Sequence, residues 1–356
     1  MMSPHSKLPM TLMEQEAREA PLCIQNQLKS NAPLWKALKV QIEKKKPAFA
    51  LTIARGSSDH AATFAKYLLE TYLGLPTVSA APSIQTLYGR TLQLHQALVI
   101  GISQSGKSPD ICEVMQQAKH QGALTVALVN QTDSPLAHLA DIVIPLGAGP
   151  EKAVAATKSY LTAISALTQG VSILAEDKLL QIALPRLAER LTEALGQDWS
   201  QLLHSLNTTQ DMLTLGRGFG YPIAQEAALK CKETCGIHAE AFSSAEVMHG
   251  PFALIKPHYT TLQFVQNDAT LESNLMLAEK IATCSGQVLM AIPQDLALKT
   301  PHSAAIIQLP MPNSLHGVLD PMIALSAFYC ALAQLAVSRG LNPDQPKNLR
   351  KVTETR

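Results

Sequence analysis

Residues 101–110, GISQSGKSPD, place three serines and a glutamine around two glycines, directly after an apolar run. The run predicts a buried strand, and Pro109 predicts the first turn of a helix with Ser108 as its N-cap. A helix N-terminus favours an anion because its N–H groups are unpaired, and Gly106 lets the backbone approach closely. A merely capped turn fits this pattern, as does an uncharged cradle for one phosphate monoester. The cradle would consist of Ser103, Gln104, Ser105 and Ser108. The nucleotide-binding pattern GxxxxGK[ST] is absent.

A second segment, 221–255, carries ionisable groups at helical spacing. Pro222 predicts a helix start, and Glu226, Lys230 and Glu233 follow at i, i+4 and i+7, which puts two carboxylates and an ammonium on one face. A solvated stripe with an ion pair is one interpretation. Because the surrounding residues are mostly Ala, Ile, Leu and Cys, a partly dry cleft is the other. There a carboxylate can move a proton at carbon while the ammonium stabilises a developing enolate oxygen.

Other candidate catalytic groups and metal ligands are sparse. His249, followed by Gly250 and Pro251, is expected on an exposed loop, where it can titrate near neutral pH, although a lone histidine is often structural. Cys231 and Cys235 lie one helical turn apart, but no further ligand stands at zinc spacing, so no metal is expected. The six cysteines contain no CxxC pair, which suits a reducing cytoplasm.

Composition restricts the classes of protein to which the chain can belong. Its 356 residues, 47% hydrophobic and 16% charged, are enough for two globular domains. The formal net charge of +1 gives no electrostatic footprint for nucleic acid or a membrane surface. The N-terminus lacks the apolar core of a signal peptide, and the polar residues within 321–337 favour a buried helix over a membrane span. We therefore expect a soluble, cytoplasmic protein.

An internal repeat indicates which elements position these segments. LTIARG at 51–56 matches LTLGRG at 213–218, with an offset of 162 (217 − 55) between Arg55 and Arg217, and an alanine-rich helical pattern follows each. Strands alternating with helices predict an α/β fold in which helices cover both faces of a parallel sheet. Two copies predict two such lobes, joined through a helix-rich segment at 157–207, although chance similarity is the alternative. Only the first copy keeps the serine-rich turn, at a strand's carboxyl end, where ligands of such sheets gather.

Several motifs, in the right order, resemble the sugar isomerase (SIS) domain family, specifically the isomerase half of glucosamine-6-phosphate synthase. The segment GRGFGYPIAQEAALKCKETCGIHAEAFSSAEVMHGPFALI resembles the family's signature, and GISQSGKSPD resembles its phosphate loop. The segment EKAVAATKSYLTAI resembles the family's linker to the second lobe, and DQPKNLRKVTETR resembles its C-terminal tail. The resemblance implies two tandem flavodoxin-like lobes with parallel sheets in αβα layers, and a homodimer with shared active sites. The predicted boundaries are an N-terminal helical segment at 1–46, a first lobe with the phosphate loop at 47–195, a second lobe with the catalytic helix and histidine loop at 196–340, and an active-site tail at 341–356.

The resemblance also implies a substrate and roles for individual residues. The substrate would be a hexose 6-phosphate, whose phosphate meets Ser103, Gln104, Ser105 and Ser108, with Ser57, Ser58 and the backbone of Val154 near the sugar. Glu233 would move a proton between C1 and C2 with help from Lys230, while His249 of the partner subunit opens the ring. Lys351 would meet the open-chain sugar, with Arg350 beside it.

Departures from the synthases favour a stand-alone deaminase. The chain opens with Met-Met-Ser, so we expect no glutaminase domain and no cysteine nucleophile at position 2, and net release of ammonia is the sensible direction. Arg-Gly-Ser-Ser at 55–58 stands where the synthases carry Cys-Gly-Thr-Ser, Lys107 replaces a glutamate and Ala156 a serine. The resemblance thus implies a glucosamine-6-phosphate deaminase that gives fructose 6-phosphate and ammonia. No metal or organic cofactor is expected, because the neighbouring nitrogen and carbonyl acidify the C2 hydrogen.

Other functions remain open at this point. A related enzyme could act on galactosamine 6-phosphate, could deglycate a fructosamine 6-phosphate, or could interconvert aldose and ketose without nitrogen. SIS lobes also serve as non-catalytic sugar-phosphate sensors, which would have lost the carboxylate or gained a DNA-binding domain. Glu233 and His249 are both present, and residues 1–46 are too few for such a domain besides the first helix.

Overall fold

A computed structural model describes residues 10–299 and 302–351, so the last part of the predicted tail, 352–356, lies outside the described residues. The chain forms two compact units. Of the described residues, 20–150 and 158–189 form the first unit, and 10–19, 151–157, 190–299 and 302–351 form the second unit. The long helix α1 (Leu12–Lys45) contributes its first residues to the second unit and the rest to the first.

The first unit contains a five-stranded sheet in the order β2-β1-β3-β4-β5, in which all neighbouring strands are parallel. Its strands are β1 (Phe49–Ile53), β2 (Thr77–Ser79), β3 (Ala97–Ser103), β4 (Leu124–Val129) and β5 (Ile142–Pro145). Its other helices are α2 (Ser57–Leu73), α3 (Ser83–Thr86), α4 (Pro109–His120), α5 (Pro135–Leu139), α6 (Lys158–Leu174), α7 (Lys178–Ala183) and the 3-10 turn η1 (Leu184–Arg186), while α8 (Leu187–Ala194) runs into the second unit.

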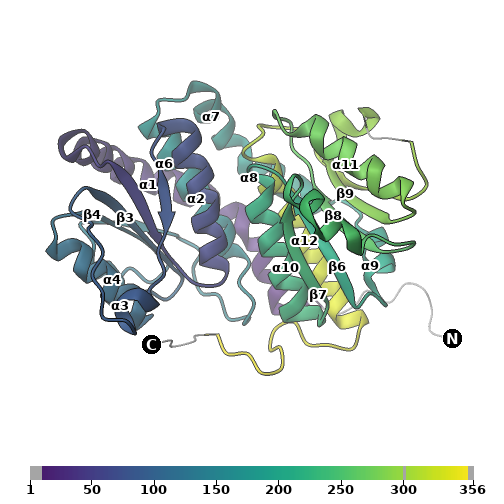
Figure 1. Ribbon diagram of the computed structural model, residues 1–356, viewed down its shortest axis with the longest axis horizontal. Coiled ribbons are helices and arrows are strands. Elements are labelled where there is room, and N and C mark those ends of the chain that lie inside the picture. Colours follow the sequence, from purple (N-terminus) through teal and green to yellow (C-terminus); the bar gives the residue numbers. More distant parts are fainter. Residues whose placement is uncertain (1–9, 300–301, 352–356) are drawn as a thin grey trace. The chain divides into compact units, whose positions relative to one another are not determined.

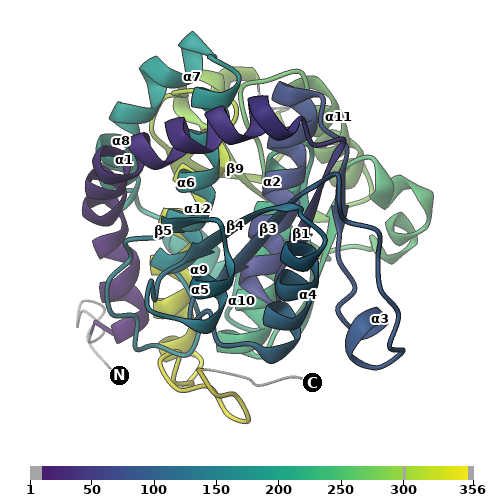
Figure 2. The same cartoon turned by 90° about the vertical axis from the view of Figure 1, so that its left-hand side faces the viewer.

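Alternating side chains of the central strands pack against helices on both faces of this sheet. Val99 of β3 and Ala127 of β4 belong to a buried cluster with residues of α4 and α5. Leu98 and Ile100 point to the other face, where α1, α2 and α6 lie (Figures 1 and 2). Because successive side chains of a strand face opposite ways, a run that is apolar throughout is what a sheet covered on both faces requires.

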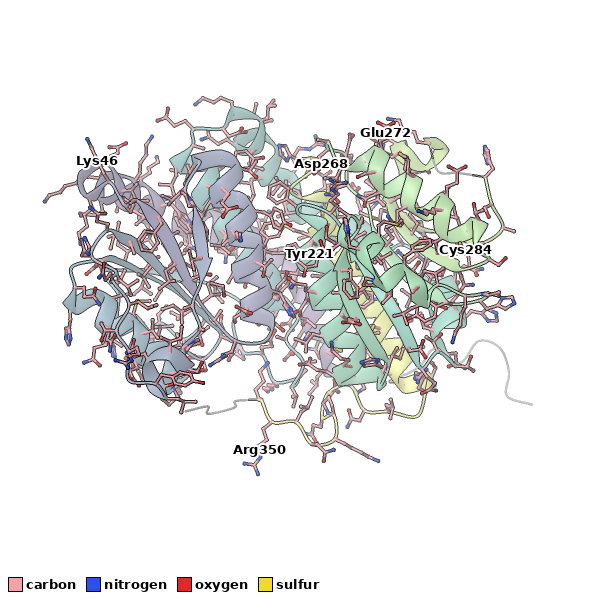
Figure 3. All side chains as sticks on the ribbon, viewed as in Figure 1. Lys46, Tyr221, Asp268, Glu272, Cys284 and Arg350 are labelled. Carbon is pink, nitrogen blue, oxygen red and sulfur yellow. The ribbon has the colours of Figure 1, made fainter. Side chains whose placement is uncertain are left out.

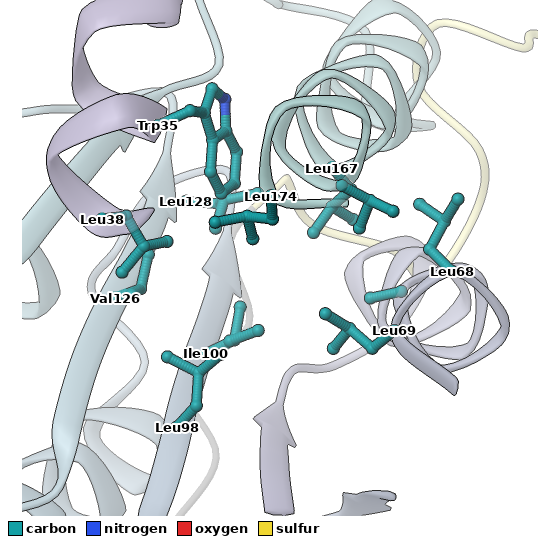
Figure 4. A pocket seen from close by; sticks show the side chains of 12 residues that line it. Trp35, Leu38, Leu68, Leu69, Leu98, Ile100, Val126, Leu128, Leu167 and Leu174 are labelled. Atoms are coloured by element: carbon teal, nitrogen blue, oxygen red, sulfur yellow. The ribbon is translucent and has the colours of Figure 1, made fainter. Parts of the chain in front are cut away.

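A small apolar cavity of about 20 Å³ lies on the α1, α2 and α6 face (Figure 4). Trp35, Leu68, Leu98, Ile100 and Leu167 are among the side chains that line it. Its walls carry no charged group, and an apolar space of this size is a feature of packing rather than a ligand site.

The second unit repeats the design with the strand order β10-β9-β8-β6-β7, again parallel throughout. Its strands are β6 (Asp211–Gly216), β7 (His238–Ser243), β8 (Thr260–Phe264), β9 (Gln287–Pro293) and β10 (Ile306–Met311). Its helices are α9 (Ser200–Leu206), α10 (Gly220–Cys235), α11 (Leu271–Thr283) and α12 (Asp320–Ser338), with the 3-10 turns η2 (Glu246–His249), η3 (Pro251–Leu254) and η4 (Gln294–Lys299). The predicted α/β fold with two parallel sheets is confirmed.

Helices cover both faces of the second sheet as well. Met290 and Ile292 of β9 belong to a buried cluster with α11, whereas Phe264 of β8 makes an edge-to-face contact with Phe328 of α12 at 6.1 Å between ring centroids. Among the described helices, α12 is long and apolar enough to pass as a membrane span, but 83% of its most apolar stretch is buried. It is the core helix that the sequence predicts.

Buried thiols in this core give a testable pH dependence of stability. Burial raises the pKa of Cys330 to about 12 and that of Cys235 to about 11, from the ordinary value of 9.0. Because the folded thiols hold their protons more tightly, their stabilisation is complete below about pH 9 and is lost as the pH rises toward the folded values. Between pH 8 and about pH 10.5 the free energy of unfolding in urea should fall by about 2 kcal/mol for each such thiol.

A cysteine series isolates this effect. The Cys330→Ala variant should show a smaller fall between the two pH values than the wild type, while the matched exposed variant Cys284→Ala should not differ from it. If the free energy of unfolding falls equally between the two pH values in Cys330→Ala and in the wild type, the buried thiol does not cause the pH dependence.

Candidate functional site

The phosphate turn, defined here as residues 103–108, begins where β3 ends and leads into α4 of the first unit. Ser103 is 7% exposed, and its hydroxyl accepts a hydrogen bond from the Gly106 N–H at 2.9 Å. Gly106 has φ +64°, and its carbonyl accepts from the Leu136 N–H at 3.0 Å, which ties the turn to α5. Ser103 therefore shapes the turn, and its hydroxyl hydrogen is left to donate.

Ser108 occupies the predicted N-cap position, and Pro109 is the first residue of α4. The Ser108 side chain makes no capping hydrogen bond, however, so the sequence predicts its position correctly but not its bonding. Gln104, Ser105 and Ser108 are half-buried. The half-buried Ser108 hydroxyl beside a helix N-terminus is a donor available to an anion.

Ser57 and Ser58 open helix α2, directly after β1. Because β1 and β3 are neighbouring parallel strands, with Ile53 paired to Gly101, their carboxyl ends meet at one edge of the sheet. Both serines are half-buried and follow Gly56, whose φ is +56°. The first unit thus brings the start of α2 and the phosphate turn to the same sheet edge.

The second unit lacks an equivalent open turn. Gln266, at the offset of Gln104 (266 − 104 = 162), is fully buried, and its amide donates to the Arg217 carbonyl at 2.7 Å and to Thr270 Oγ1 at 2.9 Å. Gln266 is therefore used to hold its own loop, whereas Gln104 is half-buried and keeps its amide near the surface. As predicted, the turn of the first copy is not repeated at this place in the second copy.

Gly106→Ala is expected to destabilise the protein by about 2 kcal/mol and to weaken phosphate binding. A methyl group there would lie 2.7 Å from Cβ of Ser134, in a left-handed backbone that favours glycine. The matched control is Gly122→Ala, where φ is +82° but no atom lies within 4 Å of the added carbon. Urea unfolding and calorimetry with inorganic phosphate measure both effects. If the two variants bind phosphate equally, the close approach at Gly106 is not what shapes the turn.

Helix α10 of the second unit carries the ionisable group, defined as Glu226, Lys230 and Glu233. The Lys230 ammonium donates a short hydrogen bond to Glu233 Oε2 and lies 3.6 Å from Glu226 Oε1. The side chains of Glu226 and Lys230 are 0% and 1% exposed, while that of Glu233 is 22% exposed. The predicted common face is therefore confirmed, and the solvated-stripe interpretation is wrong, because the helix buries this face.

Opposing effects act on the charge of Lys230. Burial alone would lower the pKa of Lys230, but the carboxylates of Glu226, Glu233 and Glu151 outweigh it and raise that pKa above its ordinary value. The side chain is therefore an ammonium at neutral pH and cannot serve as a base. An ammonium held in place without water is suited to stabilising negative charge that develops on an oxygen.

The two carboxylates of α10 differ in access. Glu226 Oε1 accepts a hydrogen bond from the Tyr329 hydroxyl of α12 at 3.1 Å, so its position is set by the core. Glu233 lies about two turns further along α10 and is the partly exposed member of the group. Of the two, Glu233 is the carboxylate with access to solvent, whereas Glu226 is buried 3.6 Å from the Lys230 ammonium.

The loop 151–157 connects the C-terminal tail with the ionisable group of α10 through Glu151. The buried carboxylate of Glu151 accepts from the Thr157 N–H at 3.0 Å and from Lys351 Nζ at 2.8 Å, and it also acts electrostatically on Lys230. Lys351 is thereby linked to the ionisable group through Glu151. The Val154 N–H donates to the Asp344 carbonyl at 3.0 Å, so this N–H is used within the protein.

Carboxylates that sequence reasoning missed hold the tail and this loop. Asp344 accepts from the Leu12 and Met13 N–H groups at 3.0 and 2.8 Å, at the N-terminus of α1. Glu16 of the same helix accepts from the backbone of residues 152 and 153. Glu151 and Tyr329 were missed as well. The sequence offered one signal for each of these two residues. Glu151 is the only carboxylate in the alanine-rich loop 151–157, and Tyr329 places a hydroxyl group in an apolar helix.

Two predicted site residues, the catalytic His249 and the substrate-binding Arg350, lie on the surface of the second unit. His249 ends the exposed turn η2 and precedes Gly250, whose φ is +146°. Arg350 is exposed and points outward (Figure 3). No hydrogen bond joins either side chain to Lys230 or Glu233 within the described part of the chain, so their roles stay predictions. The described residues hold no cluster of three or more metal-ligating side chains.

Comparisons with known proteins agree with this architecture. The model of the SIS domain matches residues 44–172. The glutamine–fructose-6-phosphate aminotransferase (isomerizing) of Aquifex aeolicus is 34% identical over 307 residues, which make up 85% of this chain and 51% of that protein. The chain thus spans about half the length of the curated relatives it matches.

Solved structures match over nearly the whole chain. A candidate phosphosugar isomerase from Silicibacter pomeroyi has a TM-score of 0.87 at 37% identity, over 94% of this chain and 100% of that one. The C-terminal domain of glucosamine-fructose-6-phosphate aminotransferase from Francisella tularensis has a TM-score of 0.84 at 26% identity, over 96% of this chain and 100% of that one. With the two parallel sheets and the matching domain model, these likenesses show that the chain belongs to the SIS-domain family.

Proposed function

We propose that this chain is a phosphosugar isomerase whose preferred reaction converts glucosamine 6-phosphate into fructose 6-phosphate and ammonia. The observation that carries the proposal is the buried ammonium of Lys230 between two carboxylates, of which Glu233 is the one with access to solvent. The names of its relatives support the substrate class, since they refer to a phosphosugar isomerase and to fructose 6-phosphate.

In this proposal the phosphate turn binds the 6-phosphate with uncharged donors. Ser105, Ser108 and Gln104 donate from their side chains, while Ser103 keeps the turn in shape and adds its own hydroxyl hydrogen. Ser57 and Ser58, at the same sheet edge, meet the sugar hydroxyls. The positive end of α4 supplies the remaining attraction for the anion.

Proton transfer between neighbouring carbons is the work of the second unit. With the ring open, the Glu233 carboxylate takes the proton from C2, and the electron pair left behind forms a C1=C2 double bond while the Lys230 ammonium stabilises the oxygen on C1. Glu233 then returns the proton to C1, and one proton passes from the nitrogen on C2 to the oxygen on C1. The enolamine thereby becomes a ketimine at C2 with a hydroxyl group on C1. Water adds to that carbon and ammonia leaves, giving fructose 6-phosphate.

The remaining predicted residues act on the sugar itself in this proposal. His249 of the partner subunit opens the sugar ring in a homodimer, and Lys351 meets the open-chain sugar with Arg350 beside it. Lys351 pairs with Glu151, so in this proposal it acts while the tail lies against the loop 151–157. The backbone of Val154 contributes its carbonyl group to the sugar.

Water is the sole co-reactant that the release of ammonia requires. The reverse reaction needs unprotonated ammonia, which is the minor form at neutral pH, since ammonium is not nucleophilic. This difference favours deamination over amination as the net direction.

Incubation of the purified protein with glucosamine 6-phosphate tests the proposal. Fructose 6-phosphate, measured with coupled enzymes, and ammonia should appear in equal amounts. Galactosamine 6-phosphate, a fructosamine 6-phosphate and nitrogen-free hexose 6-phosphates form the comparison panel. Turnover of one of these without turnover of glucosamine 6-phosphate would leave a phosphosugar isomerase but contradict the deaminase assignment. Binding without turnover across the panel would instead indicate a sugar-phosphate sensor.

A further inference from the structure

We infer that Arg55 is a positioning residue that sets the affinity of the phosphate turn by neutralising the buried carboxylate of Asp110. The inference rests on the proposed function in one respect, that the phosphate turn binds an anion. It concerns a residue at which the sequence departs from the synthases, where arginine stands in place of cysteine.

The pair links two segments at one edge of the first sheet. Arg55 follows β1, and its Nε and Nη2 both donate to Asp110 Oδ2, at 3.0 and 2.7 Å. Asp110 is the second residue of α4, two positions after Ser108, and is 1% exposed, whereas the Arg55 side chain is 50% exposed. The negative charge is therefore buried, and the positive charge faces solvent.

The carboxylate of Asp110 opposes phosphate binding in two ways, and loss of the two hydrogen bonds from Arg55 would strengthen that opposition. Its buried charge is poorly screened and lies on the helix end that should attract the anion. Its Oδ1 also accepts from the Ile111 N–H at 2.8 Å, and so occupies one of the donors of that helix end. Arg55 cancels the charge and fixes the carboxylate through its planar fork, which a lysine would do less well.

The second unit shows that this ion pair is not a requirement of the fold. Arg217 and Glu272 stand at the offset of Arg55 and Asp110 (217 − 55 = 272 − 110 = 162). Glu272 is exposed on α11 (Figure 3), and no ion pair joins it to Arg217 within the described part of the chain. The unit without a serine-rich turn therefore also lacks the buried Arg–Asp pair.

Calorimetric titration with inorganic phosphate tests the inference on the full chain. Arg55→Gln should weaken phosphate binding at least tenfold, and the double variant Arg55→Gln/Asp110→Asn should return to within about threefold of the wild type, because no buried charge is left to oppose the anion. Asp110→Asn alone should bind phosphate several-fold more tightly. Arg217→Gln, the matched control, should bind like the wild type.

Kinetics with glucosamine 6-phosphate provide the second readout. The KM of Arg55→Gln should rise by the same factor as its phosphate dissociation constant, with kcat unchanged, which a general loss of structure would not produce. Should Arg55→Gln fail to fold, Arg55→Lys and the double variant carry the test, and Arg55→Lys should weaken phosphate binding by a smaller factor.

Two results would overturn the inference. A double variant that binds phosphate as weakly as Arg55→Gln would make Arg55 a direct phosphate ligand, and wild-type affinity in every variant would show that the pair is irrelevant to the turn. Absence of phosphate binding by the wild type would be a different failure, because it would remove the anion site and the proposed function with it.

Discussion

Replacing Glu233 by glutamine should lower kcat about 10³-fold while the protein stays folded. The amide cannot accept the C2 proton, yet it preserves the shape of the side chain and an oxygen for the Lys230 ammonium. Because Glu226 remains 3.6 Å from that ammonium, the buried charge of Lys230 keeps a carboxylate partner. Steady-state kinetics with glucosamine 6-phosphate measure the loss.

Two comparisons make this result specific. Glu272→Gln removes an exposed carboxylate from α11 of the same unit and should retain wild-type kcat. Phosphate binding should be the same in Glu233→Gln and the wild type, because the phosphate turn is untouched. A kcat for Glu233→Gln within tenfold of the wild type would show that another group moves the proton.

Lys230→Met should abolish detectable turnover and lower the free energy of unfolding by about 3 kcal/mol. Glu226, Glu233 and Glu151 all act on the charge of Lys230, and its removal leaves these carboxylates facing one another without the ammonium between them. Activity falls for a separate reason, since the developing oxygen charge loses its stabilising cation. Urea unfolding and product formation are measured on the same preparation.

A second substitution separates the two losses. Lys230→Met/Glu233→Gln should recover part of the stability, because one of the opposing carboxylates becomes neutral, but none of the activity. The control is Lys232→Met on the same helix, an exposed lysine whose change should cost less than about 1 kcal/mol. If Lys230→Met unfolds like Lys232→Met, the buried charge cluster does not contribute to stability as described.

Much of the fold follows from local patterns in the sequence. The glycines that end the two alanine-rich helices, Gly74 and Gly236, both adopt left-handed C-cap conformations, as glycine permits without strain. The run QVLMAIP forms β9 (Gln287–Pro293) over its full length. These features depend on a few neighbouring residues, so their types alone determine them.

The site was predictable where its residues share one element. The spacing of Glu226, Lys230 and Glu233 places them on one face of α10, and the structure confirms it. What the helix packs against lies elsewhere in the chain: the Tyr329 hydroxyl reaches Glu226 across 103 positions, and Lys351 reaches Glu151 across 200. No local pattern specifies such pairs, because the fold brings them together.

Isotope transfer tests the central claim most directly. In heavy water, the wild type should form fructose 6-phosphate that carries deuterium on one face of C1 in those turnovers in which the partly exposed Glu233 carboxyl exchanges its proton with solvent before returning it. Glu233→Gln should form this product about 10³-fold more slowly. Labelling at C1 by Glu233→Gln at the wild-type rate, or labelling by the wild type that is spread equally over both faces of C1, would contradict the account.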